Sequence, residues 1–572
     1  MTVTGDSDAP DADWVVRIGL RGHDLVTAVH RHRGPATREV VVTTPPVGAA
    51  LDEGDRLRVE IAGHHWPAHA RNPHTGQDPA HATELRADHR TVHALRLDLP
   101  HVRPGRDELA AAAIPEEVTL TAPTVPVLPV EALVDPLSGV VRRLVDVAPV
   151  PGLPAAYTAV TAEVSDARRL GAWPADRVSL GTTFGDRDGA RTAALGEAVE
   201  RYCGNRVPRD LPLTTAAELR AAGDRCWGPE ELPLLAPWQD GRPYLRFTDD
   251  LPIRWIAGVE ADGEPTWLPA SWALLNHHSG ARRDEPRFHH LNYAGIATGD
   301  GATDAHRRGL LELVERDALE RWWHLGLPSH GIDLASVPGL DAALAGAAFD
   351  VHLVELPTEY PAAVVGAVVV DPQTGIVAGG GAARFDAAEA ATKAVLEAVH
   401  TWVFTRGLLD PDGWVYASID AGVLARGLYL DHRADRHYRD DAGERYAAVR
   451  DLGAQVQVWL DPRVQEEHLP RFTAPATHGP LRTGPAGDLA SLTSALLADG
   501  HRIARVDLTT PDVAETPWRV VRTCATGLVP NAPAAFRYWG LPRWRDTARA
   551  HGLDLDPATG PDGLVHCPPP FL

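Results

Sequence analysis

Lysine, cysteine and methionine are scarce in this sequence. Lys393 is the only lysine among 572 residues, and there are four cysteines and one methionine. A P-loop needs a lysine between a glycine and a Ser or Thr, whereas Lys393 lies in AATKAVLEA, so that phosphate-binding loop is excluded. A protein-kinase site, which needs a lysine in a VAIK-like strand, is excluded for the same reason. The cysteines lie far apart and form neither a CxxC pair nor a disulfide framework.

Long hydrophobic runs and an excess of basic residues are also missing. No stretch approaches the roughly 18 consecutive apolar residues of a membrane span, and the acidic start MTVTGDSDAPDADW differs from a signal peptide. Basic residues number 55 and acidic residues 77, a net charge of −22, which argues against binding to nucleic acid or a membrane surface. Neither GxSxG nor HExxH occurs. We therefore expect a cytoplasmic chain; if it binds a nucleotide, it does so without a P-loop.

The chain is longer than the roughly 250–300 residues at which single cores stop growing, so we expect more than one domain. Residues 14–120 contain short β-like runs and much histidine, and the proline-rich segment 122–130 is typical of a linker. From residue 131, glycine-bounded strands alternate with long amphipathic helices. The sequence predicts a small β-rich N-terminal domain at 1–125, of unknown role, and an α/β domain at 131–572.

Three apolar runs in the larger domain predict strands at 351–357, 362–371 and 375–382. The glycines at 379–381 are interpreted as a tight connection from a strand to a helix, which is a more common use of glycine than a phosphate loop. Trp322 and Trp323 are interpreted as core or interface anchors.

Three helix-like segments share one frame, which indicates an internal repeat. They read ARTAALGEAVER from Ala190, AHRRGLLELVER from Ala305 and AATKAVLEAVHT from Ala390. A glycine-containing turn and an acidic residue suited to helix capping precede each of them. These acids are Asp186 or Asp188, Asp304 and Asp386. The pattern predicts internally repeated strand–helix units.

The first two segments end in Glu-x-x-Glu-Arg. Glutamates three positions apart lie on one helix face and repel each other unless a cation lies between them. Two such helices facing each other would offer an oxygen cage suited to Mg²⁺, with positions left for phosphate oxygens and water. The carboxylates are Glu197, Glu200, Glu312 and Glu315. Arg201 and Arg316 could pair with phosphate or brace the carboxylates. The alternative is that these glutamates lie on a solvated helix face. The occurrence of the motif twice in the same frame favours a metal-binding site.

Three segments carry a resemblance to a known family. SLGTTFGDRDGARTAALGEAVERYC, NYAGIATGDGATDAHRRGLLELVERDA and the final CPPPFL resemble the YcaO family, and most of all its azoline-forming peptide cyclodehydratases. LVDPLSGVVRRL, DLTTPDV and VVRTCATGLVP are similar to the family pattern as well. The resemblance covers roughly residues 131–572 and leaves 1–125 outside. It implies a YcaO-type α/β fold.

The resemblance implies ATP- and Mg²⁺-dependent cyclodehydration of a ribosomally made precursor peptide. A Cys, Ser or Thr side chain adds to the preceding carbonyl, the oxyanion takes the γ-phosphoryl group, and loss of phosphate leaves a thiazoline or oxazoline. The four glutamates match the family's Mg²⁺ ligands. Residues at or near its nucleotide contacts are Arg201, Arg316, Asp300, Asp304 and Glu397, with Ser179, Arg142 and Arg143 as weaker candidates.

The sequence departs from the family pattern at four places. Gly181-Thr-Thr stands where Gly-Lys-Gly is often found, and Asp300 where Asn is common. His400 replaces a Gln in the third repeat, and the Pro-x-Pro-x-Pro tail lacks its last proline.

The C-terminus is the candidate for a catalytic role, through Pro568, Pro570 and Leu572. Consecutive prolines fix φ near −65° and remove backbone donors, so this segment is expected to be a stiff polyproline strut. It would deliver the Leu572 carboxylate to a defined place, where it accepts the proton of the attacking thiol or hydroxyl or positions the substrate.

The resemblance also bears on partners. About 130 N-terminal residues are too few for both a leader-binding winged helix and a ubiquitin-activating-enzyme-like domain, so we expect a separate protein that binds the leader peptide. A flavin azoline dehydrogenase and a second copy of the chain are further candidate partners. Two other functions stay open: another YcaO chemistry, such as thioamide or amidine formation, and a degenerate scaffold in a synthetase complex.

Overall fold

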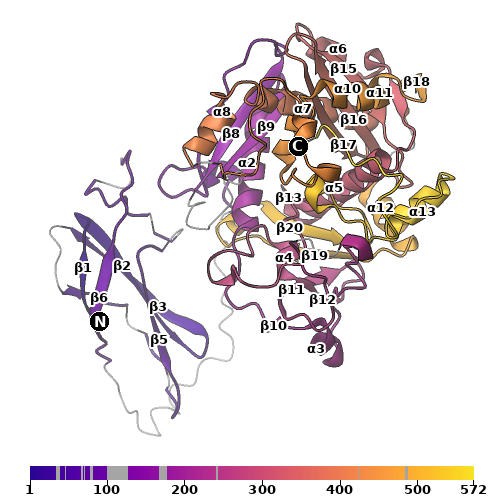
Figure 1. The fold of residues 1–572 in the computed structure, drawn as a ribbon. Helices are drawn as coiled ribbons and strands as arrows, with labels where there is room; N and C mark the ends of the chain where they lie inside the picture. Colours follow the sequence, from indigo (N-terminus) through magenta and orange to yellow (C-terminus); the bar gives the residue numbers. More distant parts are fainter. Residues whose placement is uncertain are drawn as a thin grey trace. The chain divides into compact units, whose positions relative to one another are not determined.

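The computed structural model describes residues 1–33, 39–45, 47–49, 51–65, 68–69, 71–77, 82–99, 127–165, 177–239, 243–422, 424–483 and 487–571. They divide into two compact units, Met1–Arg142 and Arg143–Leu572, which we describe separately (Figure 1). Among these residues, no helix is long and apolar enough to cross a membrane. The proline-rich segment predicted as a linker lies outside the described residues, except for 127–130.

The N-terminal unit consists of two antiparallel three-stranded sheets, as expected of a small β-rich region. The first has the order β4 (Val40–Val41), β1 (Thr2–Ser7), β6 (Arg90–Arg96). The second has the order β3 (His23–Arg33), β2 (Asp11–Leu20), β5 (Leu57–Ala62). Alternate residues of β2, namely Trp14, Val16 and Ile18, are buried in its core. This spacing of two puts the three side chains on one face of the strand, and most residues on the other face are buried as well.

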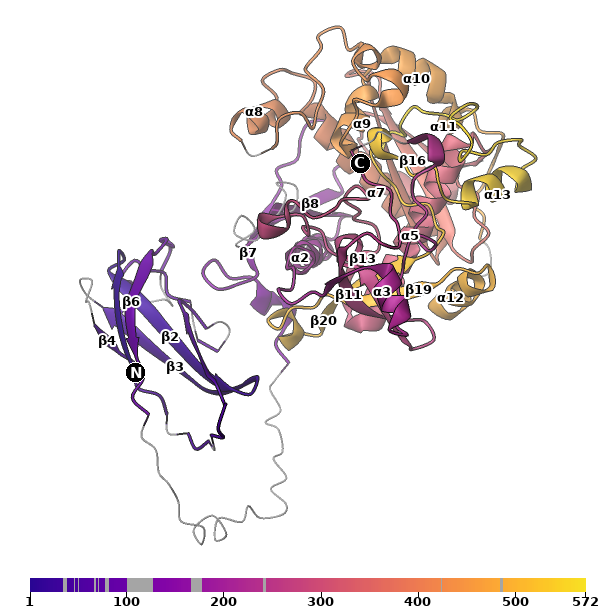
Figure 2. The same ribbon diagram turned by 60° about the horizontal axis from the view of Figure 1, so that its bottom comes forward.

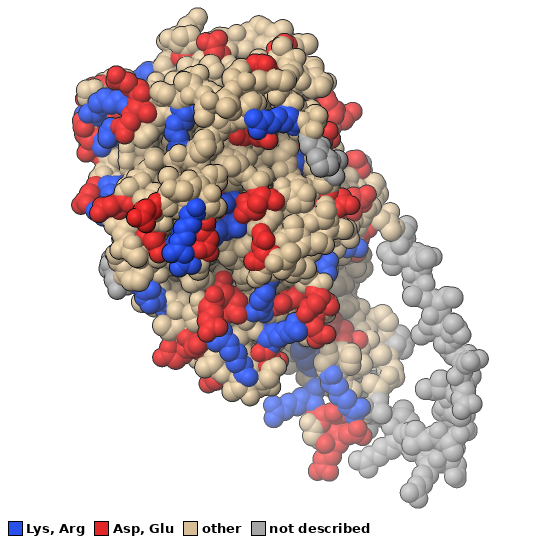
Figure 3. All heavy atoms as spheres, turned by 90° about the vertical axis from the view of Figure 1, so that its right-hand side faces the viewer, with Lys and Arg blue, Asp and Glu red and all other residues tan. Residues whose placement is uncertain are grey.

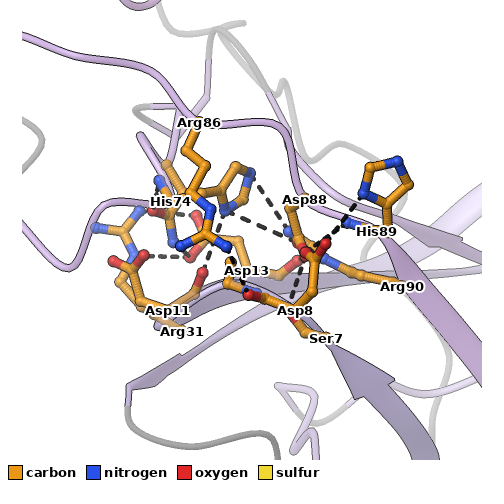
Figure 4. Close-up of polar contacts among 12 residues, drawn as sticks. Ser7, Asp8, Asp11, Asp13, Arg31, His74, Arg86, Asp88, His89 and Arg90 are labelled. Carbon is orange, nitrogen blue, oxygen red and sulfur yellow. Dashed lines mark hydrogen bonds and ion pairs between the residues drawn. The ribbon is translucent and has the colours of Figure 1, made fainter.

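Buried acids fasten the loops of this unit to β1 and β2 (Figure 4). Asp13 is 2% exposed and accepts two hydrogen bonds from Arg31, at 2.6 and 2.7 Å. Asp88 accepts a hydrogen bond from Ser7 Oγ at 2.7 Å and pairs with Arg90. A buried carboxylate is tolerated when it is paired and hydrogen-bonded in this way. We therefore interpret the cluster as structural.

The C-terminal unit is built on three sheets. The first has the order β7 (Val141–Asp146), β8 (Tyr157–Val164), β9 (Val178–Phe184). The second has the order β10 (Leu213–Thr214), β11 (Ile253–Glu260), β19 (Ile503–Asp507), β20 (Trp518–Ala525), β13 (Ile296–Asp300), and β12 (Pro265–Pro269) pairs with β11. The third has the order β17 (Ile376–Arg384), β16 (Ala363–Asp371), β15 (Asp350–Glu355), β14 (His330–Ile332), β18 (Thr477–Gly479). The strands expected at 351–357, 362–371 and 375–382 are confirmed as β15, β16 and β17.

The three helices of the internal repeat are confirmed as α2 (Arg187–Gly204), α5 (Gly301–His324) and α7 (Ala387–Arg406). Asp186 and Asp386 cap α2 and α7, each accepting a backbone N–H at 2.9 Å. The prediction that Asp304 caps α5 is wrong, because Asp300 occupies the N-cap position and Asp304 lies in the first turn. Asp304 accepts the N–H of Asp300 at 3.2 Å, so it still satisfies a donor at this helix end.

The shorter helices surround this frame. They are α3 (Ala216–Ala221), α4 (Ala270–Ala273), α6 (Leu340–Ala343), α8 (Trp414–Asp420), α9 (Leu452–Val458), α10 (Pro462–His468), α11 (Pro470–Thr473), α12 (Leu489–Ala498) and α13 (Arg543–Ala550). Acidic and basic side chains are mixed on the face of the C-terminal unit seen in Figure 3.

The three repeated units pack in a cycle. Helix α2 packs on β9 of its own unit and on β13 of the next, α5 packs on β13 and β17, and α7 packs on β17 and β9. The three helices lie inside the unit with the strands around them (Figure 2). Residues at matching positions of the repeat therefore converge on one region.

One glycine in each unit permits this close packing. A Cβ on Gly181 of β9 would lie 2.0 Å from Ala190 O, on Gly299 of β13 2.2 Å from Ala305 N, and on Gly380 of β17 2.3 Å from Ala398 N. Only glycine lets a strand backbone approach a helix backbone so closely. The interpretation of 379–381 as a strand-to-helix connection is wrong, because the three glycines lie inside β17. Gly380 faces α7, Gly379 faces the C-terminal segment and Gly381 faces α5.

Candidate functional site

The glutamates of α2 are held by two different strands. Glu197 accepts a hydrogen bond from the backbone N–H of Leu180 in β9 at 3.2 Å. Glu200 receives a backbone hydrogen bond from Thr298 in β13, the strand of the next unit. Both strands therefore fix the carboxylates of α2 at the meeting point of two repeated units.

The glutamates of α5 follow the same rule. Glu312 accepts the N–H of Gly295, which directly precedes β13, at 2.9 Å. Glu315 accepts the N–H of Ala383 in β17, the strand of the following unit, at 3.0 Å. In each pair, the first glutamate thus accepts a hydrogen bond at the strand of its own unit, and the second accepts one from the strand of the next unit. The internal repeat therefore includes these hydrogen bonds.

The electrostatics place the two pairs close together. Burial raises the pKa of Glu200 to about 8; Arg201 opposes this shift, and the charge of Glu312 on α5 adds to it. Burial also raises the pKa of Glu315, and Glu312 again adds to the effect. Carboxylates raise one another's pKa only when they lie near each other in a region of low solvation. The charge of Glu312 thus acts on glutamates of both helices, Glu200 of α2 and Glu315 of α5.

The two arginines brace these carboxylates. Arg316 pairs with Glu315 at 3.4 Å and with Glu312 at 3.7 Å. Arg201 pairs with Glu197 at 3.3 Å, and its guanidinium carbon lies 4.5 Å from the ring centre of Tyr293. A guanidinium stacked on an aromatic ring presents its N–H groups in a fixed plane, which suits carboxylate or phosphate oxygens.

Helix α7 completes the site with a neutralised acid. Glu397 pairs with Lys393. Burial alone would raise the pKa of Glu397, but Lys393, His400 and Arg316 outweigh it and lower the pKa to about 2. Burial lowers the pKa of His400, against the charges of Glu397 and Glu197. The position that carries a second glutamate in the other two helices thus holds an imidazole, close to the carboxylate of α2.

This donor set fits Mg²⁺ together with phosphate rather than a metal held by protein alone. Within the described ranges, no three His, Cys, Asp or Glu side chains are arranged to hold one metal ion. Mg²⁺ is usually bound through one or two carboxylates, with phosphate oxygens and water filling the other positions. The raised pKa of Glu200 and Glu315 marks negative charge that a cation would offset.

Three of the other predicted nucleotide contacts, Asp304, Ser179 and Arg143, have protein partners. Asp304 pairs with Arg307 and Arg308 at 2.5 and 2.8 Å, and Asp300 is exposed at the start of α5. The Ser179 hydroxyl is buried and donates to Ala194 O at 2.7 Å, where it helps β9 pack on α2. Arg142 and Arg143 are exposed on β7, and Arg143 pairs with Glu163 at 2.8 Å.

The C-terminal segment 567–571 is buried, not frayed. Pro568 O accepts a hydrogen bond from Trp459 Nε1 at 2.8 Å, and Pro570 O accepts the N–H of Gly379 in β17 at 2.7 Å. Phe571 is 4% exposed and lies over Gly379. The predicted catalytic Leu572 lies outside the described residues.

Two residues of the site escaped the motif analysis. Tyr293 stands outside the repeated frame, and only the fold brings its ring beneath Arg201. Lys393 precedes Glu397 by four positions, the spacing of an ion pair on one helix face, so that spacing was the available signal.

Comparison with known families shows which family the chain belongs to. Residues 184–529 match the family model described as YcaO cyclodehydratase, ATP- and Mg²⁺-binding. The chain belongs to the YcaO family. ATP and Mg²⁺ are the ligands of that family, as predicted. Residues 36–97 are similar to a second model, the X-Pro dipeptidyl-peptidase C-terminal non-catalytic domain.

Relatives of the YcaO chain match it over parts of their length. An uncharacterised protein in the tfuA 3′ region of Rhizobium leguminosarum bv. trifolii is 30% identical over 134 residues, 23% of this chain and 29% of its own. An uncharacterised protein of Methanothermobacter thermautotrophicus is 27% identical over 190 residues, 32% of this chain and 46% of its own. The match thus spans less than half of either curated relative.

Two solved structures are similar. A heterocyclase in complex with substrate and cofactor has a TM-score of 0.52 and 20% identity, covering 77% of this chain and 56% of its own. This likeness shows the fold and confirms the α/β YcaO type. YcaO from Methanopyrus kandleri, bound with AMPPCP and Mg²⁺, has a TM-score of 0.42 and 17% identity, covering 69% and 90%.

Proposed function

We propose that this chain catalyses the ATP- and Mg²⁺-dependent cyclodehydration of Cys, Ser or Thr residues in a ribosomally made precursor peptide. The observation that carries the proposal is the convergence of four glutamates on α2 and α5, two of them with raised pKa, inside a YcaO domain. Phosphoryl transfer needs mainly positioning and neutralisation of charge, and a cluster of carboxylates and arginines around Mg²⁺ supplies both.

In this mechanism each side chain has a defined task. Glu197, Glu200, Glu312 and Glu315 would supply carboxylates for Mg²⁺, with phosphate oxygens and water completing its coordination, and the cation would neutralise phosphate charge. Arg201 and Arg316 pair with these carboxylates in the structure and would also offer N–H donors to phosphate oxygens.

The nucleotide would extend from this centre along α5 and α7. We retain Asp300, Asp304 and Glu397 as its contacts, because they lie on α5 and α7. Arg142 and Arg143 stay weaker candidates, on an exposed strand. The hydroxyl of Ser179 is already used inside the fold, which favours a packing role for it.

The C-terminus is proposed to serve the proton transfer. Phe571 lies on Gly379, and a Cβ on Gly381, two residues along β17, would lie 3.8 Å from Glu315 Oε1. Two residues of a strand span about 7 Å. The segment containing Pro568 and Pro570 therefore ends near the carboxylates. A terminal carboxylate at Leu572 would accept the proton of the attacking thiol or hydroxyl, or position the substrate.

The proposal includes partners. A separate protein would bind the leader of the precursor peptide, a flavin azoline dehydrogenase would oxidise the rings, and a second copy of the chain would complete a homodimer. The heterocyclase of similar fold was solved with its substrate and cofactor, which supports a site here that takes a substrate together with a cofactor.

The test is a mass balance. The purified chain, the leader-binding partner and the precursor peptide are incubated with Mg²⁺ and ATP, and the peptide is weighed by mass spectrometry while released phosphate is measured. Each ring should remove one water and release one phosphate, because the amide oxygen leaves on the phosphoryl group. Replacement of oxygen by sulfur would indicate thioamide formation instead, and an unmodified peptide under conditions of steady ATP binding would indicate a scaffold.

A further inference from the structure

The C-terminal tail, defined as residues 567–571, depends on hydrogen-bond donors from other parts of the chain. Its prolines have no N–H, so they cannot form a ladder with a neighbouring strand, but their carbonyl oxygens still need partners when buried. Three donors from separate elements meet that need. Trp323 Nε1 donates to Cys567 O at 2.7 Å, Trp459 Nε1 to Pro568 O at 2.8 Å, and Gly379 N to Pro570 O at 2.7 Å.

The two indoles are themselves fixed. Trp323 and Trp459 are both 0% exposed, and their ring centres lie 5.8 Å apart. Behind them, Arg471 donates to the backbone oxygens of Trp322 and Trp323 at 2.6 Å each, with its guanidinium carbon 4.3 Å from the Trp323 ring centre. An indole held this way offers its N–H at one point only, so it defines where the tail carbonyl must lie.

The anchors also set the direction of the tail. Val565 N donates to His324 O at the end of α5, and Trp323 holds Cys567. Further on, Pro570 reaches Gly379 of β17. The tail therefore starts beside the C-terminal end of α5 and reaches β17 at Gly379.

Along β17, the next positions lead to the glutamates. A Cβ on Gly381 would lie 3.1 Å from Leu319 of α5, and Ala383 donates its N–H to Glu315. Gly379 is required for this path, because a Cβ there would lie 2.7 Å from the Phe571 ring. Phe571, the last described residue of the tail, therefore lies on β17 two residues before Gly381, the position that faces Glu315.

We propose that Trp323 and Trp459 are positioning residues for the reaction, whose indole N–H groups hold the tail so that its end faces the glutamates of α5. This inference rests on the role proposed for the C-terminus. Without either donor, a buried carbonyl would lose its partner, and the tail would leave its place to hydrogen-bond with water. Neither indole touches the glutamates in the contacts described above, so the effect should appear in turnover rather than in nucleotide binding.

The experiment compares three indoles. Trp323→Phe and Trp459→Phe each remove a donor to the tail and keep an aromatic ring. Trp255→Phe is the matched control, because Trp255 is also 0% exposed and donates to a backbone carbonyl, Thr214 O at 3.1 Å, in another sheet. For each variant, kcat for cyclodehydration, the Kd for Mg-ATP and the melting temperature are measured.

Cys567 provides a readout that does not depend on activity. It lies at the start of the tail, is 3% exposed, and burial raises its pKa to about 12, so its thiol should react slowly with a maleimide. Labelling is followed by peptide mass spectrometry. In the two tail-side variants we expect labelling of Cys567 to be about tenfold faster or more and kcat about tenfold lower or more, with Kd changed by less than about twofold. Trp255→Phe should leave labelling and kcat as in the unmodified chain.

Deletion of residues 568–572 separates the two claims. If the deletion removes turnover but both tail-side variants turn over normally, the positioning role is overturned while the role of the C-terminus stands. If the deletion leaves turnover intact, both are overturned. An equal loss of kcat in Trp255→Phe would show a general effect of lost packing and would also overturn the positioning role.

Discussion

Helix α5 carries two acidic pairs with almost the same sequence and opposite physical chemistry. ELVER at 312–316 and DALER at 317–321 each consist of an acid, two apolar residues, Glu and Arg. In the first, burial raises the pKa of Glu315. In the second, burial would raise the pKa of Asp317, but the charges of Arg321 and Arg543 outweigh it and lower the pKa.

The difference lies in partners from distant parts of the chain. Asp317 receives Arg543 at 2.6 Å, Arg321 at 2.8 Å and the N–H of Val529 at 3.0 Å, which fills its acceptor positions. Glu315 has one backbone N–H and the shared Arg316. A saturated buried carboxylate is part of the framework, whereas an incompletely neutralised one can still bind a cation. The same local motif thus serves stability in one turn and proposed chemistry in the next.

The largest expected effect separates the pairs by activity. Glu315→Gln removes an anionic ligand while keeping the shape, so kcat should fall by about a thousandfold or more, equivalent to roughly 4 kcal/mol of transition-state stabilisation. The fold should remain, because the substitution removes a charge that is poorly neutralised. Steady-state kinetics and circular dichroism check this. Glu467→Gln, an exposed acid paired with Arg439, is the control and should keep full activity; normal turnover in Glu315→Gln would refute the carboxylate site.

The next effect is on stability. Asp317→Asn leaves Arg321 and Arg543 without their buried anion, and breaking a buried pair costs about 3–5 kcal/mol. The free energy of unfolding should therefore fall by that amount, with kcat little changed while the protein is folded. Denaturant titration measures it. A variant as stable as the original but inactive would reverse the roles assigned to the two pairs.

Substitution of the arginines that end the two motifs should affect nucleotide binding in the first motif and stability in the second. Arg316→Ala should weaken Mg-ATP binding by about tenfold, roughly 1.4 kcal/mol, the scale of one charge-assisted hydrogen bond to phosphate. Arg321→Ala should lower stability instead, since Arg321 is 5% exposed and pairs with Asp317 and Glu359. Isothermal titration with a non-hydrolysable nucleotide and thermal unfolding of both variants decide between them. If Arg316→Ala and Arg321→Ala bind the nucleotide with equal affinity, Arg316 does not belong to the nucleotide site.

The contrast also explains how far the sequence leads. Helical spacing and glycine-bounded apolar runs are local signals, so α2, α5, α7 and β15–β17 were predictable, as was the alignment of the Glu-x-x-Glu pairs. The side chains that the fold brings to these residues from distant parts of the chain were not predictable. Arg543, one of the two arginines that pair with Asp317, stands 226 positions away. The glycines of β17 reflect the approach of the C-terminal tail, α7 and α5 rather than a turn. Asp304 was misplaced as a cap because a run with acids at 300 and 304 offers two candidates for the same helix start.

The smallest effect is the pH dependence of stability, where the two classes of carboxylate should have opposite signs. For Glu200 the folded pKa of about 8 lies above the ordinary glutamate value of 4.5, so its ionisation opposes folding. The contribution of Glu200 to stability is fully present below its unfolded pKa and is lost as the pH rises toward about 8. For Asp317 the folded pKa is lowered, so its contribution is present above the unfolded pKa, about 3.9, and is lost only in stronger acid.

Melting temperatures of the metal-free protein in EDTA, measured from about pH 4 to about pH 8, test these signs. Glu200→Gln should remove a decline of a few degrees toward the alkaline end, because the amide has no charge to desolvate. Asp317→Asn should lower the whole curve and leave that decline in place, since the charge at Glu200 is untouched. Parallel curves for the original chain and Glu200→Gln would mean that Glu200 ionises in the folded protein as it does in the unfolded one. In that case the carboxylates of α2 and α5 would carry no excess charge for a cation to offset, and the distinction between the two motifs of α5 would rest on burial alone.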